Sequence, residues 1–298
     1  MNSVYLSTGA FTGRINHRNP DLLAQYFDRV RCDGFELMVM DNFYEQLGRI
    51  ISLYQRCGVR ICCVHADKHI GDLISCPDSE AFVQAEKLFS VNCEIAQTLG
   101  AEKIVVHCWG IPDSDRYPEQ IYGRVEKLVA QADRYGLDFL VENCVCTQSG
   151  PLVHLQKLAE LIPEIGFVID TRPAQFHGQL QEQCESMIWK KNVRHVHIND
   201  YGGGLMQWDA LYPILQPTKG KIDWDFFARS LQKNHYTGSI TLEAPSMLEQ
   251  GFDAQTFQRS IDFIRNRLCP KNDLQPAGKN EKNNRNVALR IDRIENKR

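Results

Sequence analysis

The sequence contains no long hydrophobic run. No stretch of about 18 uncharged apolar residues occurs in it, so no segment is predicted to span a membrane. The first residues, MNSVYLSTGAF, enter an apolar, strand-like run without a basic region or a cleavage site, so we expect no signal peptide. Charge of one sign is not in excess either. The formal net charge of −3 gives no reason to expect a nucleic-acid surface.

Cysteine is present but lacks a pattern. Eleven cysteines in 298 residues are too sparse and too odd in number for a disulfide framework, so we expect reduced thiols and a cytoplasmic protein. Several lie in apolar runs (RICCV, VVHCW, VENCVC), where cysteine packs as a small hydrophobe. Cys144 and Cys146 form C-x-C without a second pair at zinc-finger spacing, which favours structural roles.

A good glycine-rich phosphate turn is also missing after the first apolar run, which disfavours a doubly wound open sheet. The chain has instead a series of short, nearly continuous apolar runs rich in Val, Ile and Phe, typical of parallel strands covered on both faces. The predicted strands are 3–7, 34–40, 59–65, 103–109, 138–143, 166–170, 194–199 and 239–244. Their starts lie about 25 to 45 residues apart, with helical patterns such as 118–136 between them. We therefore predict an α/β fold, a single-domain (β/α)8 TIM barrel over residues 1–268.

The last 30 residues, 269–298, differ from the rest. They are polar and contain eight Lys or Arg against four Asp or Glu. We expect a flexible, mildly basic C-terminal tail that adds nothing to the barrel, and a partner-binding role for it stays open.

Ionisable residues stand at or near the ends of the predicted strands, where barrels of this kind build their active sites. Such residues inside apolar strands are costly unless they are paired or bound to a cation. A divalent cation (Mn²⁺, Mg²⁺, Co²⁺, Fe²⁺ or Zn²⁺) would hold the carboxylates and imidazole of the last four strands together. The alternative is a buried network held by Arg or Lys. The residues concerned are Glu36, His65, His107, Glu142, Asp170, His197 and Glu243.

Four segments, LVEN, VIDT, HVHIND and KGKIDWDFFARSLQKNHYTGSITLEAP, resemble the xylose isomerase-like TIM barrel superfamily of sugar isomerases, epimerases and related endonucleases. The resemblance covers roughly residues 1–268. It implies one cation held by Glu142, Asp170, His197 and Glu243, with His195 as an inward partner one layer deeper. It also implies an enediolate mechanism in which Glu142 and Glu243 exchange protons on opposite faces of the substrate.

The resemblance has gaps. Many relatives carry a histidine three residues after the aspartate of the sixth strand, where this chain has Pro173. His65 and His107 stand where related endonucleases bind another zinc. The segment 201–220, however, contains no histidine to complete their cluster, which disfavours DNA cleavage.

Other residues are candidates for contact with the substrate. His65, His107 and Trp109 are expected to line the pocket wall, although His107 could instead be a satisfied core histidine. Arg172 could bind a carboxylate or phosphate of the substrate, or form an outward salt bridge. Glu36 could bind substrate hydroxyls or pair with a basic neighbour.

Three functions follow from these expectations. The first is a metal-dependent isomerase or epimerase acting on a keto sugar, sugar phosphate or related polyol. The second is a lyase that dehydrates a cyclic polyol or hydroxy acid, and the third is a non-catalytic sugar-binding relative. The expected partner is a small carbohydrate or polyol, with neither a membrane nor a nucleic acid, and association into a homo-oligomer stays open.

Overall fold

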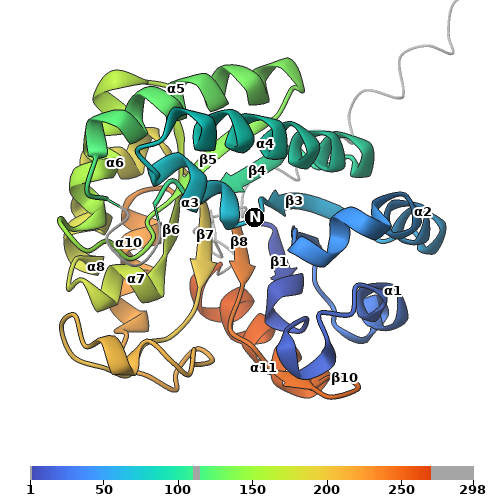
Figure 1. Cartoon of the computed structure of the whole chain (residues 1–298). Helices are drawn as coiled ribbons and strands as arrows, with labels where there is room; N and C mark the ends of the chain where they lie inside the picture. Colours follow the sequence, from blue (N-terminus) through green and yellow to red (C-terminus); the bar gives the residue numbers. More distant parts are fainter. Residues whose placement is uncertain (1, 110–114, 270–298) are drawn as a thin grey trace, which may run out of the picture.

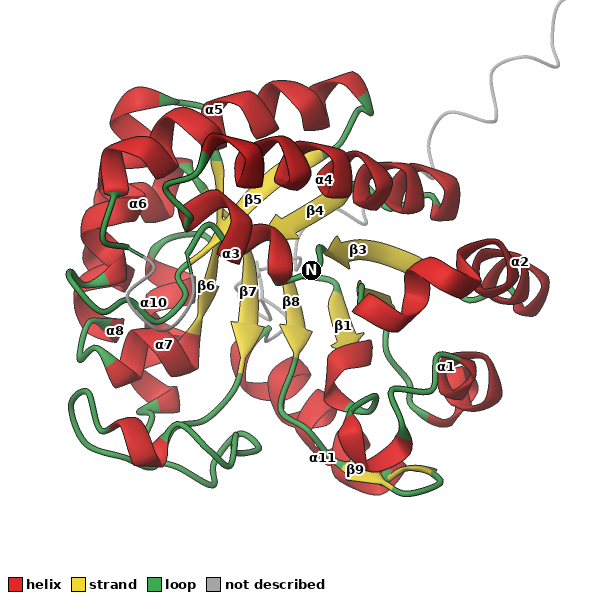
Figure 2. Cartoon of the chain, in the orientation of Figure 1, coloured by secondary structure: helices red, strands yellow, loops and turns green. Residues whose placement is uncertain are grey.

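The computed structural model describes residues 2–109 and 115–269. Eight parallel strands close into a barrel in sequence order, each hydrogen-bonded to the next and β8 to β1. Figure 1 shows the strands at the centre with the helices around them, and Figure 2 shows the same arrangement by element type. The predicted TIM barrel is confirmed. The strands are β1 (Val4–Ser7), β2 (Gly34–Met38), β3 (Ile61–His65), β4 (Lys103–Val106), β5 (Asp138–Glu142), β6 (Gly166–Asp170), β7 (Val193–Ile198) and β8 (Ser239–Leu242).

Helices fill the connections between strands, and local sequence fixes their ends. The Asp78 side chain accepts from the backbone N–H of Glu80 and caps the longest helix, which ends at Gly100 with a left-handed φ of 74°. The helices are α1 (Asp21–Tyr26), α2 (Leu47–Cys57), α3 (His69–Ser75), α4 (Ser79–Leu99), α5 (Pro118–Arg134), α6 (Pro151–Leu161), α7 (Thr171–Phe176), α8 (Leu180–Glu185), α9 (Met187–Lys191), α10 (Trp224–Lys233) and α11 (Ala254–Phe263). A short antiparallel pair, β9 (Met247–Leu248) and β10 (Gly251–Phe252), precedes α11. No helix within the described ranges has the length and apolar character needed to cross a membrane.

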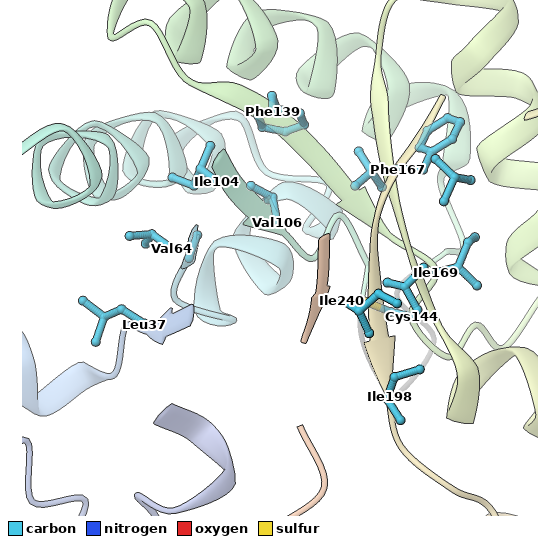
Figure 3. Packing of buried hydrophobic residues seen from close by; sticks show 14 of the residues in the cluster. Leu37, Val64, Ile104, Val106, Phe139, Cys144, Phe167, Ile169, Ile198 and Ile240 are labelled. Atoms are coloured by element: carbon cyan, nitrogen blue, oxygen red, sulfur yellow. The ribbon is translucent and has the colours of Figure 1, made fainter. Parts of the chain in front are cut away.

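The main core lies between the barrel and the helices. Outward-facing strand residues such as Ile104, Phe139 and Phe167 are almost fully buried there, and Figure 3 shows them with their neighbours. All eleven cysteines are free thiols in the described part of the chain, and most are buried, as small hydrophobes would be. Cys269 is buried too, so the ordered fold reaches the first residue of the predicted tail. The rest of that tail, 270–298, lies outside the described residues.

The barrel interior has an apolar half and a polar half. Inward positions on β3 to β6 form a small cluster of their own, Cys63, Val105, Leu140 and Val168. Inward positions on β2, β7 and β8 are polar and equally buried, namely Glu36, His195, Ser239 and Thr241. The next inward position on most of these strands carries one of the residues predicted to form the site.

Candidate metal centre

Four side chains from the last four strands converge at the carboxyl end of the barrel. One donor atom from each of Glu142, Asp170, His197 and Glu243 lies within 4.8 Å of every other. The alternation of side chains along a β-strand explains this convergence, because each of the four residues lies two positions beyond an inward-facing residue of its own strand. The structure therefore brings together the four residues that the sequence proposes as ligands. His197 is fully buried, and the side chain of Glu243 is the most accessible of the four at 13%.

The donor geometry suits a divalent cation. Nδ1 of His197 lies 3.4 Å from Oε1 of Glu142 and 3.4 Å from Oε2 of Glu243, so the imidazole faces both carboxylates. Oε1 of Glu243 is buried and has no hydrogen-bond partner among the described residues. Buried carboxylate oxygens are rarely left without a partner, and a cation would satisfy this one. Mixed carboxylate and imidazole ligands fit Mn²⁺, Fe²⁺, Co²⁺ or Zn²⁺.

The electrostatics of the centre lead to the same conclusion. Burial raises the pKa of Asp170 to about 7, with Glu142 and Glu243 acting in the same direction and Arg172 against it. Burial alone would also raise the pKa of Glu142, but the neighbouring His107 and His197 hold that pKa well below its usual range. Three carboxylates in one buried space repel one another, and a cation removes that repulsion.

Glu142 is shared with two further histidines. Its Oε2 atom is 2.7 Å from Nε2 of His107 and 3.1 Å from Nε2 of His65. Nδ1 of His65 bonds the carbonyl of Ala66 at 2.9 Å. Because both partners of His65 only accept, its ring donates from both nitrogens, which agrees with a pKa that Glu142 raises against the effect of burial. The second oxygen of Glu142 is thereby fixed, and Oε1 faces His197.

One layer deeper, His195 and Glu36 support His197. Nε2 of His195 bonds Oε2 of Glu36 at 2.8 Å, and its Nδ1 bonds Oγ of Ser239 at 2.6 Å. Nε2 of His197 lies 3.0 Å from Oε1 of the same glutamate. His195 is therefore the inward partner that the sequence predicted. Of the two roles left open for Glu36, these contacts favour pairing with basic neighbours.

A cavity of about 240 Å³ opens above the four donors. Of the predicted substrate-contacting residues, His107, Trp109 and Arg172 line it, whereas His65 and Glu36 are not among the lining residues. The strand register explains both exceptions: His65 aligns with Val105, one layer below His107, and Glu36 precedes the end of β2 by two residues. The lining consists of Lys68, Asp72, His107, Trp109, Glu142, Cys144, Val145, Asp170, Arg172, Pro173, Leu211, Tyr212 and Glu243.

A wider cleft of about 730 Å³ lies beside this cavity, at the ends of β2 and β3. It is larger, but its polar groups already bond one another, as Arg18 does with Asp41 at 2.6 Å and Tyr44 with Asp67 at 3.0 Å. We place the chemistry in the smaller cavity, because the converging donors lie there. Lys68 lines both.

Sequence reasoning missed several residues of the site. Asn199 donates to Oδ2 of Asp170 at 3.0 Å and lies 3.5 Å from Oε2 of Glu243. The period of two could have identified it, since Asn199 follows His197 by two positions. Lys68 and Tyr212 come from loops, for which no periodic pattern exists.

The long loop after β7 is fixed by Asp200. This carboxylate accepts from the backbone of Ile222 at 3.2 Å and from the indole of Trp224 at 3.0 Å. A Cβ atom at Gly220 would lie 2.4 Å from Oδ1 of Asp200, so only glycine permits the approach. The segment KGKIDW therefore anchors the loop that brings Leu211 and Tyr212 to the cavity.

A family comparison agrees with this architecture. The pattern of the family described as xylose isomerase-like TIM barrel matches residues 32–267. The chain belongs to the xylose isomerase-like TIM barrel family. No curated protein matches the sequence.

Several solved structures share the fold at low identity. The 3-keto-D-glucoside 4-epimerase YcjR from E. coli superposes with a TM-score of 0.64 at 18% identity, covering 89% of this chain and 100% of its own. The IolI protein with a bound zinc atom gives 0.68 at 15% identity, with 89% and 99% covered. The D-psicose 3-epimerase from Clostridium cellulolyticum H10, solved with D-tagatose, gives 0.61 at 14% identity, with 89% and 99% covered.

Proposed function

We propose that this protein is a divalent-metal-dependent isomerase or epimerase of a keto sugar or related polyol. The observation that carries the proposal is the convergence of Glu142, Asp170, His197 and Glu243 at the base of a sugar-sized cavity. Structural relatives that epimerise sugars, and one that holds zinc, support the assignment. A bound cation would stabilise the negative charge that develops on the substrate oxygens when a proton leaves the neighbouring carbon.

The two glutamates would exchange that proton. Glu142 comes from β5 and Glu243 from β8, three strands apart around the barrel, so their carboxylates can address opposite faces of a flat enediolate. The hydrogen bonds from His65 and His107 hold Oε2 of Glu142, which leaves Oε1 toward the donors. Asn199 would position both Asp170 and Glu243, and Glu36 would position His197.

The test is solvent deuterium exchange. The Mn²⁺-loaded protein is incubated in D₂O with D-tagatose, D-fructose and a 3-keto glucoside, and the α-carbon proton is followed by NMR. We expect exchange at one α-carbon of at least one of these sugars. Glu142→Gln and Glu243→Gln should each slow it by about 10²- to 10⁴-fold with an unchanged circular dichroism spectrum.

Glu94→Gln serves as the matched control, because Glu94 is exposed on α4 and is not among the residues that line the cavity. Near-normal exchange in either active-site variant would refute the two-glutamate mechanism. A product lighter by one water would assign the protein to the dehydratases instead. Sugar binding without exchange would assign it to the non-catalytic relatives.

A further inference from the structure

Two cationic side chains line the cavity without forming an ion pair among the described residues. Lys68 is exposed at the start of α3, and Arg172 follows the metal-facing Asp170 by two residues. Both lie in a cavity that is also lined by carboxylates, the groups with which Lys and Arg ordinarily pair. The carboxylates that line the same cavity are Asp72, Glu142, Asp170 and Glu243.

The contacts of Arg172 leave part of its guanidinium group free for a ligand. Its Nη1 atom donates to the carbonyl of Leu211 at 3.3 Å, which orients the group beneath the loop after β7. Its Nε atom is buried and has no partner in the described part of the chain. A buried N–H without an acceptor is unfavourable unless something else supplies that acceptor. The Nε and Nη atoms of arginine together match a carboxylate or phosphate group.

The charge balance of the cavity depends on the cation. Among the groups that line the cavity, His107 is neutral, because burial lowers its pKa to about 4, and the protonated His65 lies one layer below. A divalent ion on the four donors, Lys68 and Arg172 would then balance the four lining carboxylates. Without the ion, the carboxylates outnumber the cationic side chains and repel an anion. Arg172 can therefore attract an anionic group strongly only when the metal is bound.

We propose that the substrate carries one anionic substituent, a carboxylate or a phosphate monoester, and that Arg172 binds it through two hydrogen bonds. Lys68, from the loop after β3, adds positive potential at the same cavity. The cavity of about 240 Å³ limits the substrate to roughly one sugar unit. This inference rests on the proposed function in one respect, that the substrate occupies the cavity above the metal donors.

Calorimetric titration of the Mn²⁺-loaded protein tests the proposal, with D-fructose, D-fructuronate and D-fructose 6-phosphate as probes. We expect one of the two anionic sugars to bind about tenfold or more tightly than D-fructose, and the tighter one identifies the substituent. Arg172→Gln should remove that preference, so that the preferred anionic sugar loses more affinity than D-fructose does. Arg172→Lys should restore part of it, because the charge remains while the paired geometry is lost. Lys68→Gln should weaken anion binding by a smaller factor.

Arg56→Gln and Lys233→Gln are the matched controls, since both side chains are exposed on helices away from the cavity. They should change nothing. Equal binding of the three sugars to the wild-type protein, or an equal loss for all three in Arg172→Gln, would overturn the anionic substrate while the proposed function stands. If neither Mn²⁺ nor any of the sugars binds, the proposed function fails and this inference with it.

Discussion

Replacing Glu36 by glutamine tests how the barrel interior prepares the proposed metal centre. The carboxylate of Glu36 is completely buried and accepts hydrogen bonds from His195 (2.8 Å), His197 (3.3 Å) and Thr241 (2.8 Å). Burial alone would raise the pKa of Glu36, but the two histidines lower it well below its usual range, so the group is an ionised acceptor. It therefore fixes the proton of His197 on Nε2 and leaves Nδ1 free to bind a cation.

In Glu36→Gln, one of the two acceptor oxygens becomes an NH₂ group that faces donors. Only one acceptor oxygen then remains for His195, His197 and Thr241, and the proton of His197 can move to Nδ1, the nitrogen that would bind a cation. Changes of such outer partners weaken metal binding by about 10- to 100-fold, or roughly 1.4 to 2.7 kcal/mol. The assay is competition for Co²⁺ or Zn²⁺ between the protein and a chelating dye. Glu94→Gln is again the control for the loss of one carboxylate.

Thr241→Val separates this effect from general damage to the interior. It removes one hydroxyl donor to Glu36 while keeping both the shape and the carboxylate, so the proton of His197 should stay on Nε2. Metal affinity should then change much less than in Glu36→Gln. If folded Glu36→Gln bound the metal as tightly as the wild type, or if Thr241→Val lost as much affinity, the argument from the His197 tautomer would be refuted.

Three further predictions concern stability. Mn²⁺, Co²⁺ or Zn²⁺ at a concentration a hundred times the dissociation constant should add about 2.7 kcal/mol to the free energy of unfolding and raise the melting temperature. In Asp170→Asn, most of this increase in melting temperature should be absent. Gly220→Ala should lower urea stability by about 1 to 3 kcal/mol, because its Cβ would clash with Asp200, whereas Gly123→Ala, where a Cβ meets no atom within 4 Å, should not. Burial would raise the pKa of Asp115, but backbone N–H groups of the loop after β5 lower it to about 2. Because the pKa of Asp115 is lower in the folded than in the unfolded state, its ionised carboxylate stabilises the fold above the unfolded-state pKa near 4, and this stabilisation is lost as the pH falls toward 2. The difference in melting temperature between the wild type and Asp115→Asn should therefore shrink from pH 4 to pH 2.

Much of this architecture could be predicted from the sequence because it follows from the two-residue alternation of side chains along a β-strand. Each predicted strand overlaps an observed one, with ends displaced by a few residues, as for 103–109 against Lys103–Val106. The alternation that makes β-strand residues face inward also brought together Glu142, Asp170, His197 and Glu243. The same rule placed His195 beneath His197.

The course of the loops and the depth of each inward-facing residue in the barrel could not be predicted in this way. Lys68 and Tyr212 reach the cavity through segments whose course depends on tertiary contacts, such as those that Asp200 makes with the end of its loop. The level of an inward residue also depends on strand register. His65 and Glu36 both face inward, yet the stagger of neighbouring strands places them below the cavity rather than in it.

The two halves of the barrel interior hold the four proposed metal ligands by different means. Glu142 and Asp170 stand above apolar residues, so their hydrogen bonds come from the sides. His65 and His107 donate to Glu142, and Asn199 and the backbone N–H of Arg172 donate to Asp170. His197 stands above a polar layer and is held from below by Glu36. A carboxylate has two oxygens, and one can be fixed laterally while the other binds a cation. An imidazole presents its two nitrogens on opposite sides, so the acceptor that frees Nδ1 must lie deeper in the barrel. The buried polar half of the interior is therefore a requirement of placing a histidine, rather than another carboxylate, at the end of β7.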